Sequence, residues 1–186
     1  MSTRESILQL ADTLIRDKGY NAFSFNDISK SIGIKTASVH YHFPTKTDLG
    51  IAIVRTHIER VTALRAAQKD QPPLKKLESF LSIYTKVKAE NKVCIVGSLA
   101  TDLLTVEEEM KSELKILTKL ILEWVTEILE EGRTKKVFTF EGLARTKALM
   151  VITNMLASVQ LTRLTDNPND FEIIKSTILA DLLHKK

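Results

Sequence analysis

The sequence contains few of the residues that cross-link or interrupt a chain. Its 186 residues include one cysteine, four prolines and six glycines. One cysteine cannot form a disulfide within the chain. Few prolines and glycines leave little of the turn chemistry that separates short strands. These absences exclude a disulfide-stapled fold and favour an all-α protein with long helices.

Long hydrophobic runs are also missing. No apolar stretch reaches the roughly 20 residues that a membrane-spanning helix needs, and the first 20 residues carry polar side chains at helical spacing. A signal peptide would be continuously apolar in that region. With 44% hydrophobic and 27% charged residues, the chain can still bury a substantial core. We therefore expect a cytoplasmic protein without membrane contact.

The net charge of +4 is small but unevenly distributed. Residues 1–69 hold 10 lysines and arginines against 6 aspartates and glutamates, whereas the rest of the chain holds 17 of each. This asymmetry is typical of a small nucleic-acid-binding head on a neutral body. Chance remains an alternative, because only four charges are involved.

Start and stop signals divide the first 43 residues into three helices. Ser2 or Thr3 can cap a first helix that ends at Gly19. Ser24, with Asp27 three residues later, forms a capping box for a second helix of about two turns. Gly33 follows this helix, where a tight turn needs a residue that accepts positive φ. The pattern predicts a helix-turn-helix.

The segment Thr36–Phe43 has two different faces at 100° per residue. Val39 and Phe43 fall on one side with Thr36, and we expect that side to pack on the first two helices. The outward face holds a small residue, a hydroxyl, an aromatic ring and an imidazole: Ala37, Ser38, Tyr41 and His42. Such side chains can approach base edges and phosphates closely.

Fixed spacings across these helices carry a family resemblance. The matching residues are Gly19, Phe23, Ser24, Asp27, Ile28, Gly33, Ile34, Ser38, Val39, Tyr41, His42, Phe43, Lys46 and Leu49. The first 60 residues thereby resemble the DNA-binding domain of the TetR/AcrR family of bacterial transcriptional repressors. The resemblance implies that the third helix enters the major groove and that Lys46 touches a phosphate. It also implies a helical C-terminal domain that binds an inducer and dimerises.

Two residues depart from the family pattern. His40 stands where family members usually have tyrosine, and Lys35 stands where they usually have serine. Together with the resemblance, the outward face predicts contacts to double-stranded DNA, at a roughly palindromic operator. The predicted DNA-binding residues are Ser24, Lys35, Thr36, Ala37, Ser38, His40, Tyr41, His42 and Lys46.

Breaks in the hydrophobic pattern suggest the domain organisation. We expect a helix-turn-helix DNA-binding domain over residues 1–48, a linking helix over about residues 46–69, and an effector-binding and dimerisation domain over residues 70–186. Pro72 and Pro73 mark the second boundary. Further helices are expected from Leu74, from about Cys94 and from Thr105 to Gly132, which gives about nine helices in all.

The body contains candidate effector-binding or sensing residues, namely Cys94, Phe80, Tyr84, Ser98, Trp124 and Met155. Some relatives within the resembled family use a cysteine near the sequence position of Cys94 to sense electrophiles or oxidants. Cys94 also fits a small buried hydrophobe, because thiol reactivity depends on an environment that sequence does not reveal. The aromatic residues and methionine likewise fit an ordinary core.

The last two predicted helices, over about residues 140–164 and 170–184, are apolar on more than one face. A surface helix needs only one apolar face, so the second predicts burial against another subunit. We therefore expect a homodimer through these helices. A helix buried wholly within a monomer is the alternative.

Catalytic and metal-binding patterns are weak. His40 and His42 point about 200° apart on a helix, and neither a phosphate-binding loop nor a catalytic triad is recognisable. We therefore predict no enzyme, cofactor or metal site, but a transcriptional regulator, a repressor released by a small molecule or by modification of Cys94. A helical enzyme and a helix-turn-helix used only for protein interaction remain alternatives.

Overall fold

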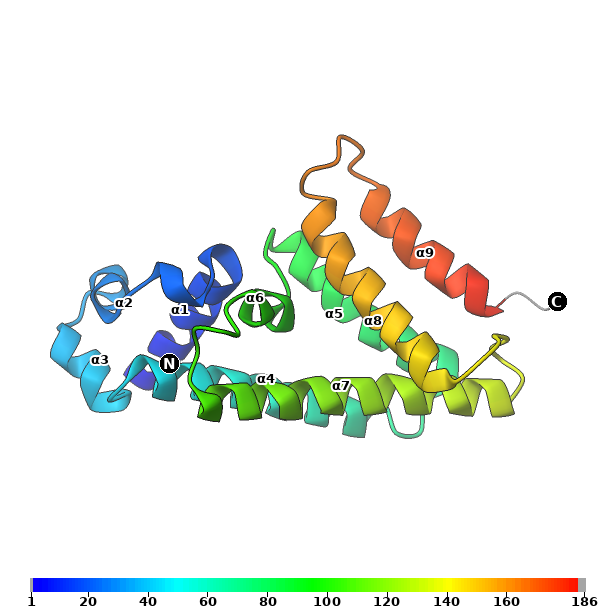
Figure 1. The fold of residues 1–186 in the computed structure, drawn as a ribbon, viewed down its shortest axis with the longest axis horizontal. Helices are drawn as coiled ribbons and strands as arrows, with labels where there is room; N and C mark the ends of the chain where they lie inside the picture. Colours follow the sequence, from blue (N-terminus) through cyan, green and yellow to red (C-terminus); the bar gives the residue numbers. More distant parts are fainter. Residues whose placement is uncertain (1, 184–186) are drawn as a thin grey trace. The chain divides into compact units, whose positions relative to one another are not determined.

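The computed structural model describes residues 2–183, which contain nine α-helices and one short 3₁₀ helix (Figure 1). The elements are α1 (Thr3–Lys18), η1 (Tyr20–Ala22), α2 (Phe25–Ile32), α3 (Thr36–His42), α4 (Lys46–Ala67), α5 (Pro73–Ala89), α6 (Ile95–Thr101), α7 (Glu108–Thr134), α8 (Ala144–Leu161) and α9 (Asp170–Leu183). The all-α prediction is confirmed. Met1 and residues 184–186 lie outside the described residues. Met1 is the first residue of the predicted DNA-binding domain. Residues 184–186 are the last of the predicted effector-binding domain, and residue 184 is the predicted end of the last helix.

The chain packs into two compact units. The head unit comprises residues up to Arg60 together with Cys94–Thr118, and the body unit comprises Val61–Val93 together with residues from Lys119 onward. Helices α4 and α7 each contribute residues to both units. The packing thus groups α6 and the first part of α7 with the helix-turn-helix. The expected division by function, at residues 48 and 70, stays a prediction.

Local capping explains where the head helices begin. Ser2 Oγ accepts a hydrogen bond from the Glu5 backbone N–H, and the Glu5 carboxylate accepts one from the Ser2 N–H at 2.7 Å. Ser24 and Asp27 form the same reciprocal box at the start of α2. Gly33 ends α2 with φ 72° and ψ 33°, the left-handed conformation that glycine adopts most easily. These three predictions are confirmed.

Helix α7 differs from its predicted course at both ends. Thr105 was expected to open it, but α7 begins at Glu108, and the Thr105 hydroxyl instead donates to the Asp102 carbonyl within the preceding turn. Helix α7 also continues past Gly132 to Thr134. A Cβ atom at position 132 would lie 1.9 Å from the Phe138 ring, so glycine serves close packing there and does not end the helix.

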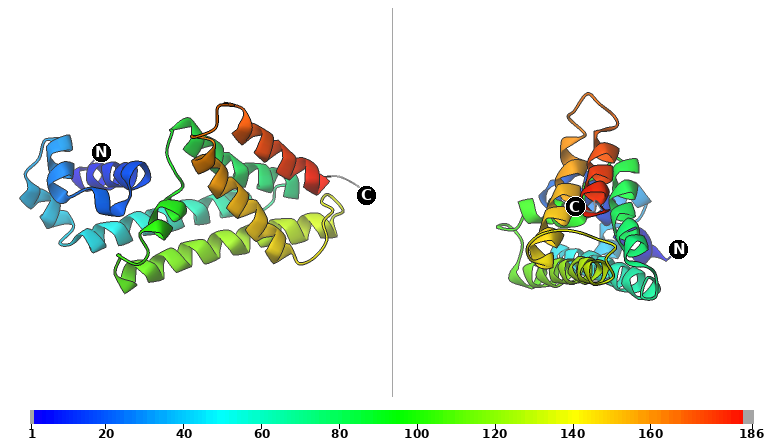
Figure 2. Two further views of the ribbon diagram at one scale, coloured as in Figure 1. Left: turned by 45° about the horizontal axis from the view of Figure 1, so that its top comes forward. Right: turned by 90° about the vertical axis from the view of Figure 1, so that its right-hand side faces the viewer.

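The body unit is built from helices packed on one another. Helix α5 packs against α8, and α8 lies beside α9 (Figure 2). Four large side chains of α5 are buried in the core: Leu77, Phe80, Leu81 and Tyr84. Among residues 2–183, no helix is both long and apolar enough to cross a membrane.

Candidate nucleic-acid interface

Helices α2 and α3 form the helix-turn-helix that the sequence predicts. Val39 and Phe43 are buried, as expected for the inward face of α3. The Thr36 hydroxyl lies 3.0 Å from the Ser29 hydroxyl of α2, so Thr36 also faces inward and a hydrogen bond ties the two helices together. This packing fixes which side chains α3 presents outward.

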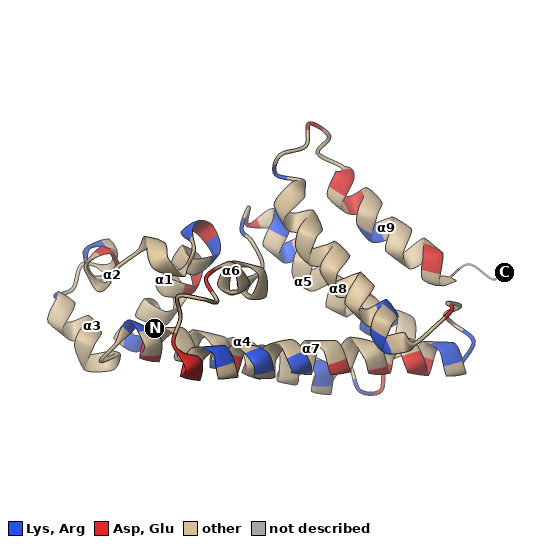
Figure 3. Cartoon of the chain, viewed as in Figure 1, with Lys and Arg blue, Asp and Glu red and all other residues tan. Residues whose placement is uncertain are grey.

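The outward face of α3 is exposed and uncharged. Tyr41 is 85% exposed, Ala37 is exposed, and Ser38 and His42 are half-buried. Together with Thr3 and Ile34 they line a shallow hollow of about 380 Å³. Helix α3 carries no Lys, Arg, Asp or Glu (Figure 3). A face with small, hydroxyl and aromatic groups but without carboxylates suits base edges and phosphates.

The two residues that depart from the family pattern have different surroundings. Lys35 is exposed at the N-cap of α3, where its side chain makes no capping hydrogen bond. The His40 ring packs edge-on against Phe25 at 4.8 Å, and its Nδ1 lies 3.2 Å from the Pro44 carbonyl oxygen. His40 therefore has contacts within its own fold, whereas Lys35 is available to a phosphate.

Lys46 opens α4 but points toward the protein. Its ammonium donates to the Phe23 carbonyl oxygen and lies 4.3 Å from the centre of the Phe23 ring and 4.8 Å from that of Tyr20. Burial lowers the pKa of Lys46 from its ordinary value, against the opposing effect of the Asp102 and Asp27 carboxylates. A phosphate contact by Lys46 stays a prediction, and it would require the side chain to turn outward.

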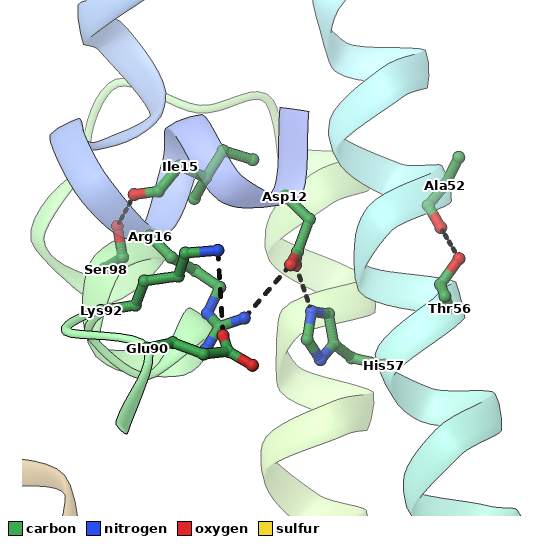
Figure 4. A network of polar contacts seen from close by, with 9 residues as sticks. All are labelled: Asp12, Ile15, Arg16, Ala52, Thr56, His57, Glu90, Lys92 and Ser98. Carbon is green, nitrogen blue, oxygen red and sulfur yellow. Dashed lines mark hydrogen bonds and ion pairs between the residues drawn. The ribbon is translucent and has the colours of Figure 1, made fainter. Parts of the chain in front are cut away.

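Inside the head unit, a polar network connects helix α1 with helix α4 (Figure 4). Asp12 accepts from Arg16 at 3.3 Å and contacts His57 Nε2 of α4 at 2.5 Å. Burial raises the pKa of Asp12, but the hydrogen bond and charge of His57, together with Arg16, outweigh it and leave the pKa below its ordinary value. The Asp12 carboxylate therefore favours the folded head.

We expect Asp12→Asn to lower the free energy of unfolding by about 1–3 kcal/mol at pH 7, because it removes the charge from a largely buried pair. Since the folded pKa is depressed, this stabilisation is present above about pH 4 and is lost as the pH falls through the folded pKa. Urea unfolding of both proteins at pH 7 and at about pH 3.5 measures the difference. Asp17→Asn, at an exposed position of the same helix, is the control. Equal losses for the two variants would contradict the prediction.

Helix α6 and the turn after it are fastened to the end of α1. The Ser98 hydroxyl donates to the Ile15 carbonyl at 2.6 Å, and Asp102 accepts from the Tyr20 backbone N–H at 2.8 Å. Asn21 donates to both Asp102 and Thr105. These contacts join residues 81 to 84 positions apart. They explain why α6 packs with the head unit.

The predicted effector-binding residues fall into two groups. In the body unit, the Phe80 ring lies 5.6 Å from Tyr84 and 5.8 Å from Trp124, and all three are buried, as is Met155. In the head unit, Ser98 binds α1, and Cys94 is half-buried at the N-cap position of α6. The structure thus brings Phe80, Tyr84 and Trp124 together, and Trp124 also lines a groove.

Sequence reasoning missed several residues of this interface. Thr3 and Ile34 border the hollow on α3, and the Arg4 guanidinium lies 5.1 Å from the centre of the Phe43 ring. The sequence feature that could have identified Arg4 is its basic side chain in the first turn of α1. Asp102 had no such signal, because its partners lie more than 80 residues away.

Comparisons with known proteins agree with this geometry. The family model of bacterial regulatory proteins of the tetR family matches residues 7–53. A TetR transcriptional regulator from Legionella pneumophila is similar in structure, with a TM-score of 0.86, 32% identity and 98% of both chains covered. An uncharacterised HTH-type regulator of Lactococcus lactis is 24% identical over 95% of this chain and 93% of its own length.

A shorter match concerns the head alone. The biofilm operon negative transcriptional regulator IcaR of Staphylococcus epidermidis is 41% identical over 46 residues, which is 25% of each chain.

Proposed function

The chain belongs to the TetR family of DNA-binding transcriptional regulators, and we propose that it is a homodimeric repressor released from a roughly palindromic operator by a small molecule or by modification of Cys94. The family consists of regulators without catalytic activity, so the helical-enzyme alternative is set aside. DNA binding through α3 is the first part of the proposal. The observation that carries it is the exposed, carboxylate-free outer face of α3 around Tyr41.

Repression is supported by the head. The matching 46 residues of the staphylococcal biofilm operon protein belong to a negative regulator. The excess of positive charge in residues 1–69 fits a segment that lies along a phosphate backbone. An inducible repressor binds its operator without effector and leaves it when effector is present.

Dimerisation is supported by the outer faces of α8 and α9. These helices and their ends leave large apolar side chains exposed: Leu143, Leu149, Met150, Leu161, Leu164, Ile173 and Leu183. Met150 and Leu161 lie three turns apart on one face of α8. We propose that a second copy of the chain covers this surface, through α8 and through α9 as far as Leu183. Residue 184, which the predicted interface included, lies outside the described residues.

Release through Cys94 is supported by the position of the thiol. The backbone carbonyl of Cys94 accepts a hydrogen bond from the Ser98 N–H at 2.9 Å, and the Ser98 hydroxyl donates a hydrogen bond to the Ile15 carbonyl of α1. Addition to an α,β-unsaturated carbonyl joins Sγ to the β-carbon, and the thiol proton ends on the α-carbon. An adduct at the start of α6 would disturb the contact between Ser98 and α1.

We expect N-ethylmaleimide to weaken operator binding of the native chain by about tenfold or more, and Cys94→Ser to abolish this response while binding DNA normally. Because the chain has one cysteine, the reagent has one thiol target. Fluorescence anisotropy of a labelled operator, with mass spectrometry of the adduct, measures both. Equal release of the two proteins would make Cys94 structural.

A gel-shift titration with the DNA upstream of the protein's own gene tests the proposal as a whole. The expected result is a sequence-specific complex that weakens steeply as salt rises. A helix-turn-helix used only for protein interaction would give no such complex. Binding without sequence preference would equally overturn an operator-specific repressor.

A further inference from the structure

The body unit contains a groove of about 440 Å³ between α4, α5 and α7. Its lining residues come from the end of α4 and the turn after it, the first turn of α5 and the second half of α7. They are Thr62, Arg65, Ala66, Lys69, Lys76, Leu120, Trp124, Glu127, Ile128 and Glu131. The volume lies within the range of small-molecule sites, about 300–1,000 Å³.

The floor of the groove is apolar and firmly held. Trp124 and Ile128 are almost completely buried, and Leu120 beside them is half-buried. The Trp124 ring is fixed edge-on against Phe80 at 5.8 Å. Because Trp124 and Ile128 are already almost completely buried, the hydrocarbon or aromatic body of a ligand would gain most of its apolar contact from Leu120.

The walls carry more positive than negative charge. Three cations line the groove, Arg65, Lys69 and Lys76, against the two carboxylates Glu127 and Glu131. Arg65 donates to both oxygens of Glu127 at 2.7 Å. Among the described residues, the Lys69 ammonium has no carboxylate partner. An anion entering the groove therefore meets one unpaired cation.

Lys76 is a second cation that the same anion can reach, because its partner Glu131 is also paired with Lys135. The Glu131 carboxylate accepts from Lys76 at 2.6 Å and from Lys135, outside the groove, at 2.7 Å. The hydrogen bonds from Lys135 and Lys76 lower the pKa of Glu131, so it stays ionised. If Lys76 turns to a ligand, Lys135 still neutralises Glu131, and no carboxylate is left unpaired.

We propose that this groove binds an amphipathic organic anion, with its acidic group at Lys69 and Lys76 and its apolar body over Leu120, next to Trp124. The proposal rests on the regulator proposed above and names the chemical class of its small-molecule effector. A cationic ligand would have to displace Arg65 or Lys76 from its glutamate. A neutral ligand would not provide the Lys69 ammonium with a negatively charged partner.

Trp124 makes the groove directly observable, because it is the only tryptophan of the chain. Decanoate, decan-1-ol and decyltrimethylammonium have unbranched alkyl chains of similar length and differ in charge. Each compound is titrated into the protein below its micelle concentration. Decanoate should give a saturable change in tryptophan fluorescence and bind at least about tenfold more tightly than the other two compounds.

Lys69→Gln and Lys76→Gln should each weaken decanoate binding by about tenfold. The matched control is Lys75→Gln, on the same turn of α5 as Lys76. Lys75 pairs with Glu78 and does not line the groove, so its substitution should leave binding unchanged.

Equal or tighter binding of the alcohol or the ammonium compound would overturn the proposal, as would decanoate binding that neither groove variant weakens. The titration contains no DNA, so failure of the regulator to bind its operator would leave this result intact. Conversely, an operator complex without decanoate binding would overturn only the effector class.

Discussion

Tyr41→Ala is expected to reduce operator affinity by about 30-fold or more while leaving the fold and the dimer intact. Tyr41 is 85% exposed, and apart from the His42 ring at 5.2 Å it contributes little to packing. An exposed side chain of this kind costs about 0.5 kcal/mol or less in stability when truncated. A base or phosphate contact costs about 1–3 kcal/mol, and a two-fold dimer loses it twice.

Fluorescence anisotropy with the labelled operator measures the affinity, and thermal melting and sedimentation check the fold and the dimer. Tyr41→Phe separates the hydroxyl from the ring, because it keeps the aromatic surface. His40→Ala tests a second predicted DNA-binding residue of α3. Because the His40 ring faces Phe25 rather than the hollow, this variant should weaken operator binding less than Tyr41→Ala. Undiminished binding by Tyr41→Ala would show that another face of the helix-turn-helix meets DNA.

The parts of the fold that were predictable from sequence depend on short-range interactions. Ser2 and Ser24 cap helices through partners three residues away, and Gly33 adopts the left-handed conformation within a single turn. The two faces of α3 follow from helical periodicity, so Val39 could be placed inside and Tyr41 outside. These features need no knowledge of the tertiary structure.

The remainder depends on contacts between distant segments. Thr105 has the sequence signature of a helix cap, but its hydroxyl accepts from Asn21, 84 residues earlier. Gly132 looks like a helix end until Phe138 folds back against it. The inward turn of Lys46 depends on the Phe23 carbonyl and two aromatic rings. Periodicity along one helix contains no information on such partners.

Helix α6 provides a physical route from the proposed sensing residue to the DNA-binding helices. It begins after Cys94, binds α1 through Ser98, and is followed by Asp102, which holds the backbone of η1 at Tyr20. Tyr20 in turn contacts Lys46 at the start of α4. We propose that a change at Cys94 would reach α1 and α4 through these hydrogen bonds and packing contacts within the head unit.

The double substitution Met150→Glu with Leu161→Glu is expected to convert the dimer to a monomer and to weaken operator binding by about 100-fold or more. The two side chains are 51% and 61% exposed on one face of α8, so the isolated chain loses little packing. In a two-fold interface each glutamate is buried twice, and every unpaired buried carboxylate costs several kcal/mol. In the monomer the two head units are no longer linked, so binding at one half-site no longer raises the effective concentration of a second head at the other half-site.

Sedimentation equilibrium measures the oligomeric state, and anisotropy titration measures operator affinity. Leu104→Glu is the control, because this leucine is 95% exposed and belongs to the head unit rather than to α8 or α9. It places the same new charge on an apolar site and should leave the dimer unchanged. A double variant that stays dimeric would place the interface elsewhere, since a C2 contact across Met150 and Leu161 cannot tolerate four buried carboxylates.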